Sequence, residues 1–251
     1  TLFRSLIMSR IKFFLLFFAI IFSTNCQDES SLVDLIKSYI QNNVSNEVLL
    51  NLIEFIRGRN NHKFPDNLDK NKKAFQNHLN TIKNNKGFIE DQSSYTDMSY
   101  GIQKVSESGC GLIAAYNVIH YLTNKDDIDF PAIIQALEND GIILRGLFGT
   151  SMKAIDEYLQ KQGFKTKSSC KKSEYDKIGQ DYNAFVLTVY NSKDDIFQGM
   201  HFMAITKKDG KFYVHNNGRN SASVAYFSIS DLLNRINGGK AKDIYLTGAK
   251  K

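Results

Sequence analysis

Apolar residues recur every three or four positions over much of the first two thirds of the chain, the spacing of one buried helix face. One such stretch begins at Cys110 and runs to Leu122 without a proline. Capping residues, glycines and prolines set the limits of the other stretches. The pattern predicts helices over 32–40, 46–56, 68–83, 110–122, 129–138 and 150–162.

After Gly163 short runs rich in β-branched and aromatic residues replace the helical spacing. These runs are typical of strands, and Lys207-Lys208-Asp209-Gly210 has the composition of a tight hairpin between two of them. The predicted strands are 184–190, 200–206, 211–215, 223–227 and 243–247, with a short helix over 230–236. Helices followed by an antiparallel sheet indicate an α+β fold.

Residues 1–26 have the pattern of a cleaved secretory signal. Met8 and a basic stretch precede the apolar run 13–22, which is too short to span a bilayer comfortably. Residues 1–7 then lie upstream of the true start. We expect a secreted protein, or one of the secretory pathway or a lysosome-like compartment. Lipid attachment at Cys26 is a weaker alternative, because the residues before it fit a lipobox poorly.

Between the signal and the main domain lies a predicted helical segment, residues 27–90. It contains the glycosylation sequon Asn43-Val44-Ser45. An inhibitory propeptide, a permanent cap and a partner-binding module all fit its composition. The main domain is then expected to cover 91–251.

Charge and composition exclude several classes of function. The formal net charge of +6 falls when the three basic residues of the signal are removed, and no basic cluster is interleaved with aromatics. We therefore expect no nucleic-acid partner. The five histidines are scattered and none has zinc-ligand spacing with cysteine, so we expect no metal and no cofactor.

Cys110 begins the predicted helix 110–122 directly after the polar turn 106–109. Free backbone N–H groups and the helix dipole at such a position favour a thiolate. Gly109 and Gly111 leave the sulfur sterically open, and Gln103 is a candidate oxyanion donor upstream. The sequence thus makes Cys110 a candidate nucleophile.

Two other interpretations of Cys110 remain open from the sequence. A cysteine in an apolar helix is commonly a packing residue. A Cys110–Cys170 disulfide is also plausible, because cysteines of secreted proteins are usually paired.

A nucleophilic thiol needs an adjacent imidazole, which in turn needs a polar group to fix its tautomer. His201 begins one predicted strand, and the hairpin returns Asn216 and Asn217 alongside it. Cys110, His201 and Asn216 can supply the three roles, with Asn217 as a rival for the third.

Several pieces of the chain resemble the papain-like C39 peptidase group. The matching pieces are Gln103, Cys110-Gly111, 149–164, 199–205, 212–216 and 227–236, and the resemblance covers about residues 95–248. It implies a papain-like fold and thiol-mediated hydrolysis of an amide bond in a peptide or protein substrate. It also implies the roles: Gln103 donates to the oxyanion, Cys110 attacks, His201 acts as base and then acid, and Asn216 orients His201.

The chain departs from that group in three places. The interval from Gln103 to Cys110 is one residue longer than usual, so the loop bulges or another group is the donor. Gly109 stands where the group has Asp, and Asn216-Asn217 stands in place of Asp-Pro.

Other functions compete with this one. Cell-wall amidases of the NlpC/P60 type are similar in strand layout, and His215 would then form a Cys-His-His site. An inactive peptidase fold kept as a binding module is a further alternative, and a transglutaminase-type acyl transfer uses similar groups.

Overall fold

The computed structural model describes residues 45–59, 62–191, 199–217 and 221–251. The chain from Asn43 to Lys251 forms one compact unit. The signal peptide predicted for residues 1–26, the helix over 32–40 and the sequon at Asn43 lie outside the described residues.

A six-stranded antiparallel sheet forms the centre of this unit, in the order β3-β8-β4-β5-β6-β7. Its strands are β3 (Lys165–Ser169), β4 (Ala184–Tyr190), β5 (Met200–Lys208), β6 (Lys211–His215), β7 (Ala225–Tyr226) and β8 (Lys242–Lys250). The mixture of helices with an antiparallel sheet confirms the predicted α+β class. Asp209 and Gly210 make the β5–β6 turn with positive φ, as such hairpins require.

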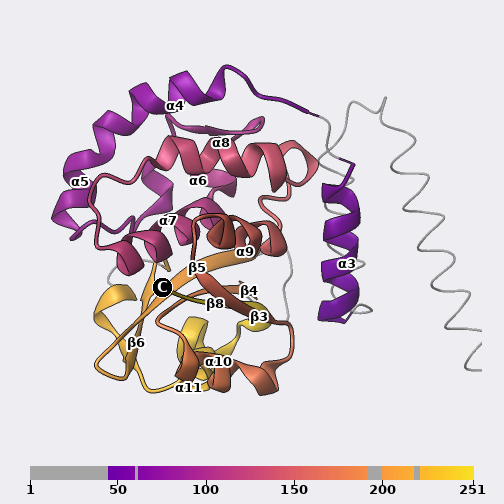
Figure 1. The fold of residues 1–251 in the computed structure, drawn as a ribbon, viewed down its shortest axis with the longest axis vertical. Helices are drawn as coiled ribbons and strands as arrows, with labels where there is room; N and C mark the ends of the chain where they lie inside the picture. The colour runs from indigo at the N-terminus through magenta and orange to yellow at the C-terminus, as the bar shows by residue number, and fades with distance from the viewer. Residues whose placement is uncertain (1–44, 60–61, 192–198, 218–220) are drawn as a thin grey trace, which may run out of the picture. The chain divides into compact units, whose positions relative to one another are not determined.

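Helices cover both faces of the sheet (Figure 1). α7 (Cys110–Thr123) is buried along nearly its whole length and packs on β5, with α8 (Phe130–Asp140) and α9 (Met152–Lys161) against it. On the other face α10 (Tyr175–Asp181) and α11 (Ile229–Arg235) close a core that includes Leu187, Met203 and Leu246. Because α7 is wrapped by sheet and helices, its first residue is held in a buried environment.

Most predicted helices that lie within the described residues are present with small shifts, and one is broken. The single helix expected over 68–83 is instead α4 (Asn67–Phe75), a 3₁₀ turn η1 (Gln76–His78) and α5 (Leu79–Asn84). Asn77 and His78 of the turn bond the Asp97 carboxylate, a partner that lies well beyond the helix in sequence. A tertiary contact therefore accompanies the break in a helix that local spacing predicts as continuous.

The sequence pattern missed several short elements: β1 (Ser99–Tyr100), β2 (Gln103–Lys104), α6 (Val105–Ser108), α10 and β3. α10 buries only Tyr175, Ile178 and Gly179, which is too few positions for a periodic signal.

No structural break occurs at the expected boundary between residues 90 and 91. Asn117 of α7 bonds both the N–H and the C=O of Ile89 at 2.9 Å, inside the core. Residues before the boundary are thus part of the same compact unit.

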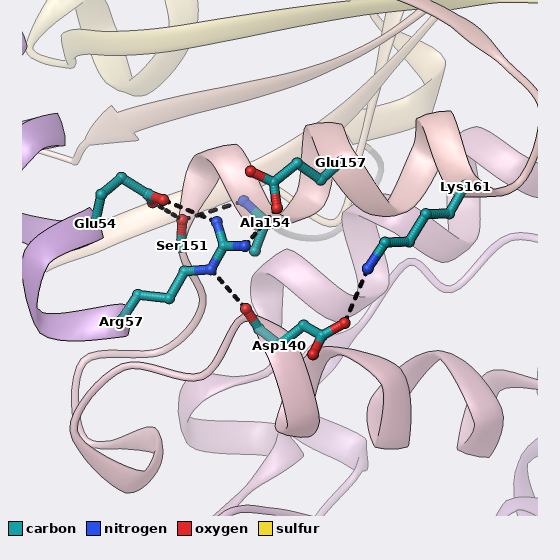
Figure 2. Close-up of polar contacts among 7 residues, drawn as sticks. All are labelled: Glu54, Arg57, Asp140, Ser151, Ala154, Glu157 and Lys161. Carbon is teal, nitrogen blue, oxygen red and sulfur yellow. Dashed lines mark hydrogen bonds and ion pairs between the residues drawn. The ribbon is translucent and has the colours of Figure 1, made fainter. Parts of the chain in front are cut away.

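α3 (Asn46–Arg57) lies at the edge of this unit. Figure 2 shows its Arg57 and Glu54 reaching the end of α8 and the start of α9. Among the described residues, no helix is both long and apolar enough to cross a bilayer.

Candidate functional site

The Cys110 side chain is 9 % exposed and begins α7 after Gly109, which caps the helix without a side-chain bond. Backbone N–H groups of Phe202, Gly111 and Cys110 itself favour the charged form of the sulfur and so lower the Cys110 pKa. Both Cys110 and Cys170 are free, so the alternative of a disulfide between them is not realised.

Burial raises the pKa of the Cys110 thiol, and the three backbone N–H groups oppose this only in part. We expected the helix terminus to favour a thiolate. The structure gives the opposite direction, because desolvation of a charged sulfur outweighs the helix dipole and the N–H groups.

His201 is partly buried on β5, and its ring is oriented by a backbone group. The distance from Nε2 to the carbonyl oxygen of Asn216 is 2.7 Å. A carbonyl only accepts, so Nε2 carries the proton and Nδ1 keeps the lone pair. Burial lowers the pKa of His201, although the Asn216 bond opposes this, so the resting imidazole is neutral.

Asn216 thus contacts His201 with its main chain, whereas we expected a side-chain contact. Its backbone is left-handed, with φ of 60°, a conformation that asparagine tolerates better than most residues. Its side-chain oxygen accepts from the backbone N–H of Gln92 instead. The asparagine side chain and its tolerance of positive φ therefore stabilise the turn of the chain, whereas the backbone carbonyl binds the imidazole.

The end of the β5–β6 ladder explains how the thiol reaches the strand. Backbone bonds in such a hairpin recur at every second pair, and the last pair is Ala204 with His215. The next N–H to point toward β6 is that of Phe202, where the chain has already turned away at Asn216. This Phe202 N–H is therefore free of a β6 partner, and it favours the thiolate form of Cys110.

The thiol and the imidazole approach this point from different faces of the sheet. His201 pairs with Val189, which belongs to the core under α10 and α11, whereas α7 lies on the opposite face. In the described residues no hydrogen bond or ion pair joins Cys110 to His201. Each group instead has a partner at the end of the β5–β6 ladder: the Phe202 backbone for the thiol and the Asn216 carbonyl for the imidazole.

Gln103 lies on β2, half-buried, and pairs with Tyr100 of β1. A Cβ added to Gly146 would lie 3.6 Å from Cβ and Cγ of Gln103. The base of the Gln103 side chain therefore lies beside Gly146. The extra residue between Gln103 and Cys110 is accommodated by α6 rather than by an open bulge.

Neither ring nitrogen of His215 is left for His201. Nδ1 lies 2.6 Å from Glu90 Oε1, and Nε2 lies 2.9 Å from Thr206 Oγ1. These contacts argue against a Cys-His-His arrangement and favour Asn216 as the group that orients His201.

Three participants were missed by sequence reasoning: the Phe202 N–H, Glu90 and Gln92. A backbone N–H leaves no signal in sequence. Glu90 and Gln92 stand in a short irregular segment without any motif, so no pattern could have identified them.

In the part of the chain that the structure describes, no group of three or more His, Cys, Asp or Glu side chains is arranged to hold a metal ion. A scan against protein-family models finds no matching family, and a search of curated proteins finds no match.

Proposed function

We propose that the chain is a thiol-dependent hydrolase of peptide bonds, with a papain-like fold similar to the C39 group. Cys110 is the nucleophile and His201 the base. The observation that supports this best is the 2.7 Å contact between His201 Nε2 and the Asn216 carbonyl, which leaves Nδ1 as a base on β5, next to Phe202. A thiol at a helix start and an oriented imidazole on a neighbouring strand are the two groups that amide hydrolysis requires.

In this mechanism both groups start neutral, as their burial favours. The Cys110 proton moves to Nδ1 of His201 as the sulfur bonds to the substrate carbonyl carbon. The imidazolium then returns the proton to the amide nitrogen, the C–N bond breaks, and a thioester and a free amine result. Asn216 contributes by accepting from Nε2, which leaves Nδ1 as the only basic nitrogen and stabilises the imidazolium.

The second half of the reaction regenerates the thiol. Water gives a proton to Nδ1 of His201 and attacks the thioester carbon. The C–S bond breaks, and the sulfur recovers the proton. The negative oxygen of each tetrahedral intermediate needs donors, and Gln103 together with the first-turn N–H groups of α7 is our proposal for them.

The test is alkylation by iodoacetamide at several pH values, read by peptide mass spectrometry in wild type and His201→Ala. Cys170 is partly exposed and free, so it is an internal reference thiol in every digest. We expect Cys110 to react at neutral pH about a hundredfold faster in wild type than in His201→Ala, the usual contribution of a positioned base. Equal Cys110 rates in the two proteins would contradict the proposal.

Turnover is tested in parallel with a fluorescein-labelled casein digest. Cys110→Ser should abolish cleavage while the unfolding temperature stays within a few degrees of wild type. Cleavage that persists in Cys110→Ser would rule out this nucleophile.

A further inference from the structure

The segment after α5 contacts two parts of the candidate site: the turn at His215 and Asn216, called the histidine half, and α6, which leads to Cys110 and is called the cysteine half. Glu90 contacts the histidine half with both carboxylate oxygens. Oε1 accepts from His215 Nδ1 at 2.6 Å, and Oε2 accepts from the backbone N–H of Asn216 at 3.1 Å. One carboxylate thus binds the last residue of β6 and the left-handed residue that follows it.

Two residues further on, Gln92 contacts both halves. Its backbone N–H donates to Asn216 Oδ1 at 3.0 Å. Its side-chain Nε2 donates to the carbonyls of Val105 and Ser106, each at 3.1 Å. Those carbonyls belong to α6, which leads through Gly109 into Cys110.

These contacts matter because Asn216 has an unfavourable backbone conformation. A left-handed conformation costs free energy in residues other than glycine, though less in asparagine, and contacts from the surroundings hold it in place. Glu90 binds its N–H and Gln92 binds its side chain, so its carbonyl is aimed at Nε2 of His201. Loss of either partner frees the carbonyl that determines which nitrogen of His201 is basic.

We propose that Glu90 and Gln92 are positioning residues of the Cys110–His201 site, an inference that rests on the proposed function. Glu90 holds the Asn216 carbonyl against His201, and Gln92 sets the separation between that carbonyl and the helix that carries Cys110. Neither residue touches the reacting atoms in this role.

The first test reads the His201 tautomer directly, without any substrate. In ¹⁵N-histidine-labelled protein above pH 7, wild-type His201 should show a protonated Nε2 and an unprotonated Nδ1, with its signals assigned by their loss in His201→Gln. Glu90→Gln offers one acceptor oxygen where the carboxylate uses two, so we expect a mixture of the two tautomers. Glu47→Gln, an exposed change on α3, is the matched control and should resemble wild type.

The second test reads the cysteine half. Gln92→Glu removes the two N–H donors on Nε2. It also places a carboxylate against the carbonyl oxygens of Val105 and Ser106. We expect the Cys110 alkylation rate to fall at least tenfold relative to Cys170, while Gln135→Glu, on the exposed side of α8, leaves it unchanged. If Gln92→Glu does not fold, Gln92→Met, which lacks the donors and the charge, takes its place.

A single wild-type tautomer in Glu90→Gln together with a wild-type Cys110 rate in the folded Gln92 variant would overturn the inference. The failure of the proposed function looks different: Cys110 alkylation would not respond to His201→Ala, whereas the tautomer experiment would still report whether Glu90 positions Asn216.

Discussion

The two parts of the predicted helical segment differ in the polar contacts that attach them to the domain. α3 buries Leu49, Leu50 and Ile53, but most of its polar contacts come from partly exposed charged side chains. Residues 67–89 are joined in addition by buried amides that bond main-chain groups. A segment that sequence predicts as one unit therefore consists of a helix whose polar contacts are largely exposed and a part whose polar contacts are largely buried.

At α3, the Arg57 guanidinium is surrounded by acceptors from three elements (Figure 2). It donates to the Asp140 carbonyl at 2.6 Å and to Glu54 at 2.8 Å, and it also pairs with Glu157. Glu54 accepts from Ser151, the N-cap of α9. Because this network is partly exposed, water and salt weaken each contact.

Residues 67–89 are held by amides with little access to water. Asn67 donates to the Gly101 carbonyl at 3.1 Å and to Glu138 at 2.6 Å, and Asn71 bonds Ser99. Asn117 completes the bonding of Ile89. Removal of this segment would leave several buried polar groups without partners, which is far more costly than loss of a surface ion pair.

The comparison narrows the propeptide hypothesis. If a part of 27–90 is removed in the mature protein, α3 and the residues before it are the candidates. Residues 67–89 are better described as the first part of the main domain.

The largest difference between α3 and residues 67–89 should be seen in the thermal unfolding of truncated chains. A chain beginning at residue 62 should keep a cooperative thermal transition, because it retains the buried amides. A chain beginning at residue 91 should lose the transition in differential scanning calorimetry. Cooperative unfolding of the shorter chain would show that residues 67–89 are dispensable.

Asn117→Leu should be the most damaging single change. It leaves the N–H and the C=O of Ile89 without partners in the core, and we expect a loss of about 3 kcal/mol in the free energy of unfolding. Urea denaturation measures it. Asn139→Leu, at an exposed position of α8, is the control and should change stability by less than about 0.5 kcal/mol.

Arg57→Gln should have a smaller effect that depends on salt. We expect a loss of about 1 kcal/mol at low ionic strength, which shrinks in 0.5 M NaCl as the charges are screened. Lys161→Gln removes the more exposed pair with Asp140 and should be nearly neutral in both conditions. A salt-independent loss in Arg57→Gln would indicate that the α3 contacts act as buried bonds.

The smallest effect should come from the buried carboxyl beside Asn67. Burial raises the pKa of Glu138, while bonds from Asn67 and Gly101 oppose the shift. A raised folded pKa means that stability is lost as pH rises from the unfolded value of about 4.3 through the folded one. Glu138→Gln should therefore stabilise the protein at pH 7 relative to wild type, and this gain should disappear near pH 4 in urea titrations.

A related pH effect tests whether the His201 imidazole is buried in the folded protein. Burial lowers the pKa of His201, so its contribution to stability is present above about pH 6.5 and is lost as pH falls through the folded value. His201→Gln should have a shallower loss of stability between pH 7 and 5 than wild type. An unchanged slope would mean that the imidazole is hydrated in the folded protein.

Elements with many periodic positions were predictable, and elements defined by distant contacts were not. α7, α9, β4 and the β5–β6 hairpin follow from spacing, capping residues and the Asp209-Gly210 turn. The break at Gln76–His78 and the short α10 do not, because each depends on partners elsewhere in the chain.

For the candidate site, sequence alone determined which residues begin the central helix and the paired strands, since those positions follow from local hydrophobic and turn patterns. Tertiary structure decided the rest: that Asn216 binds His201 with its carbonyl, that the Phe202 N–H favours the Cys110 thiolate, and that Glu90 and Gln92 bind the turn at Asn216. It also decided the directions of the thiol and imidazole pKa shifts. The physical reason is that burial and hydrogen-bond partners are set by segments far apart in sequence, which local patterns cannot bring together.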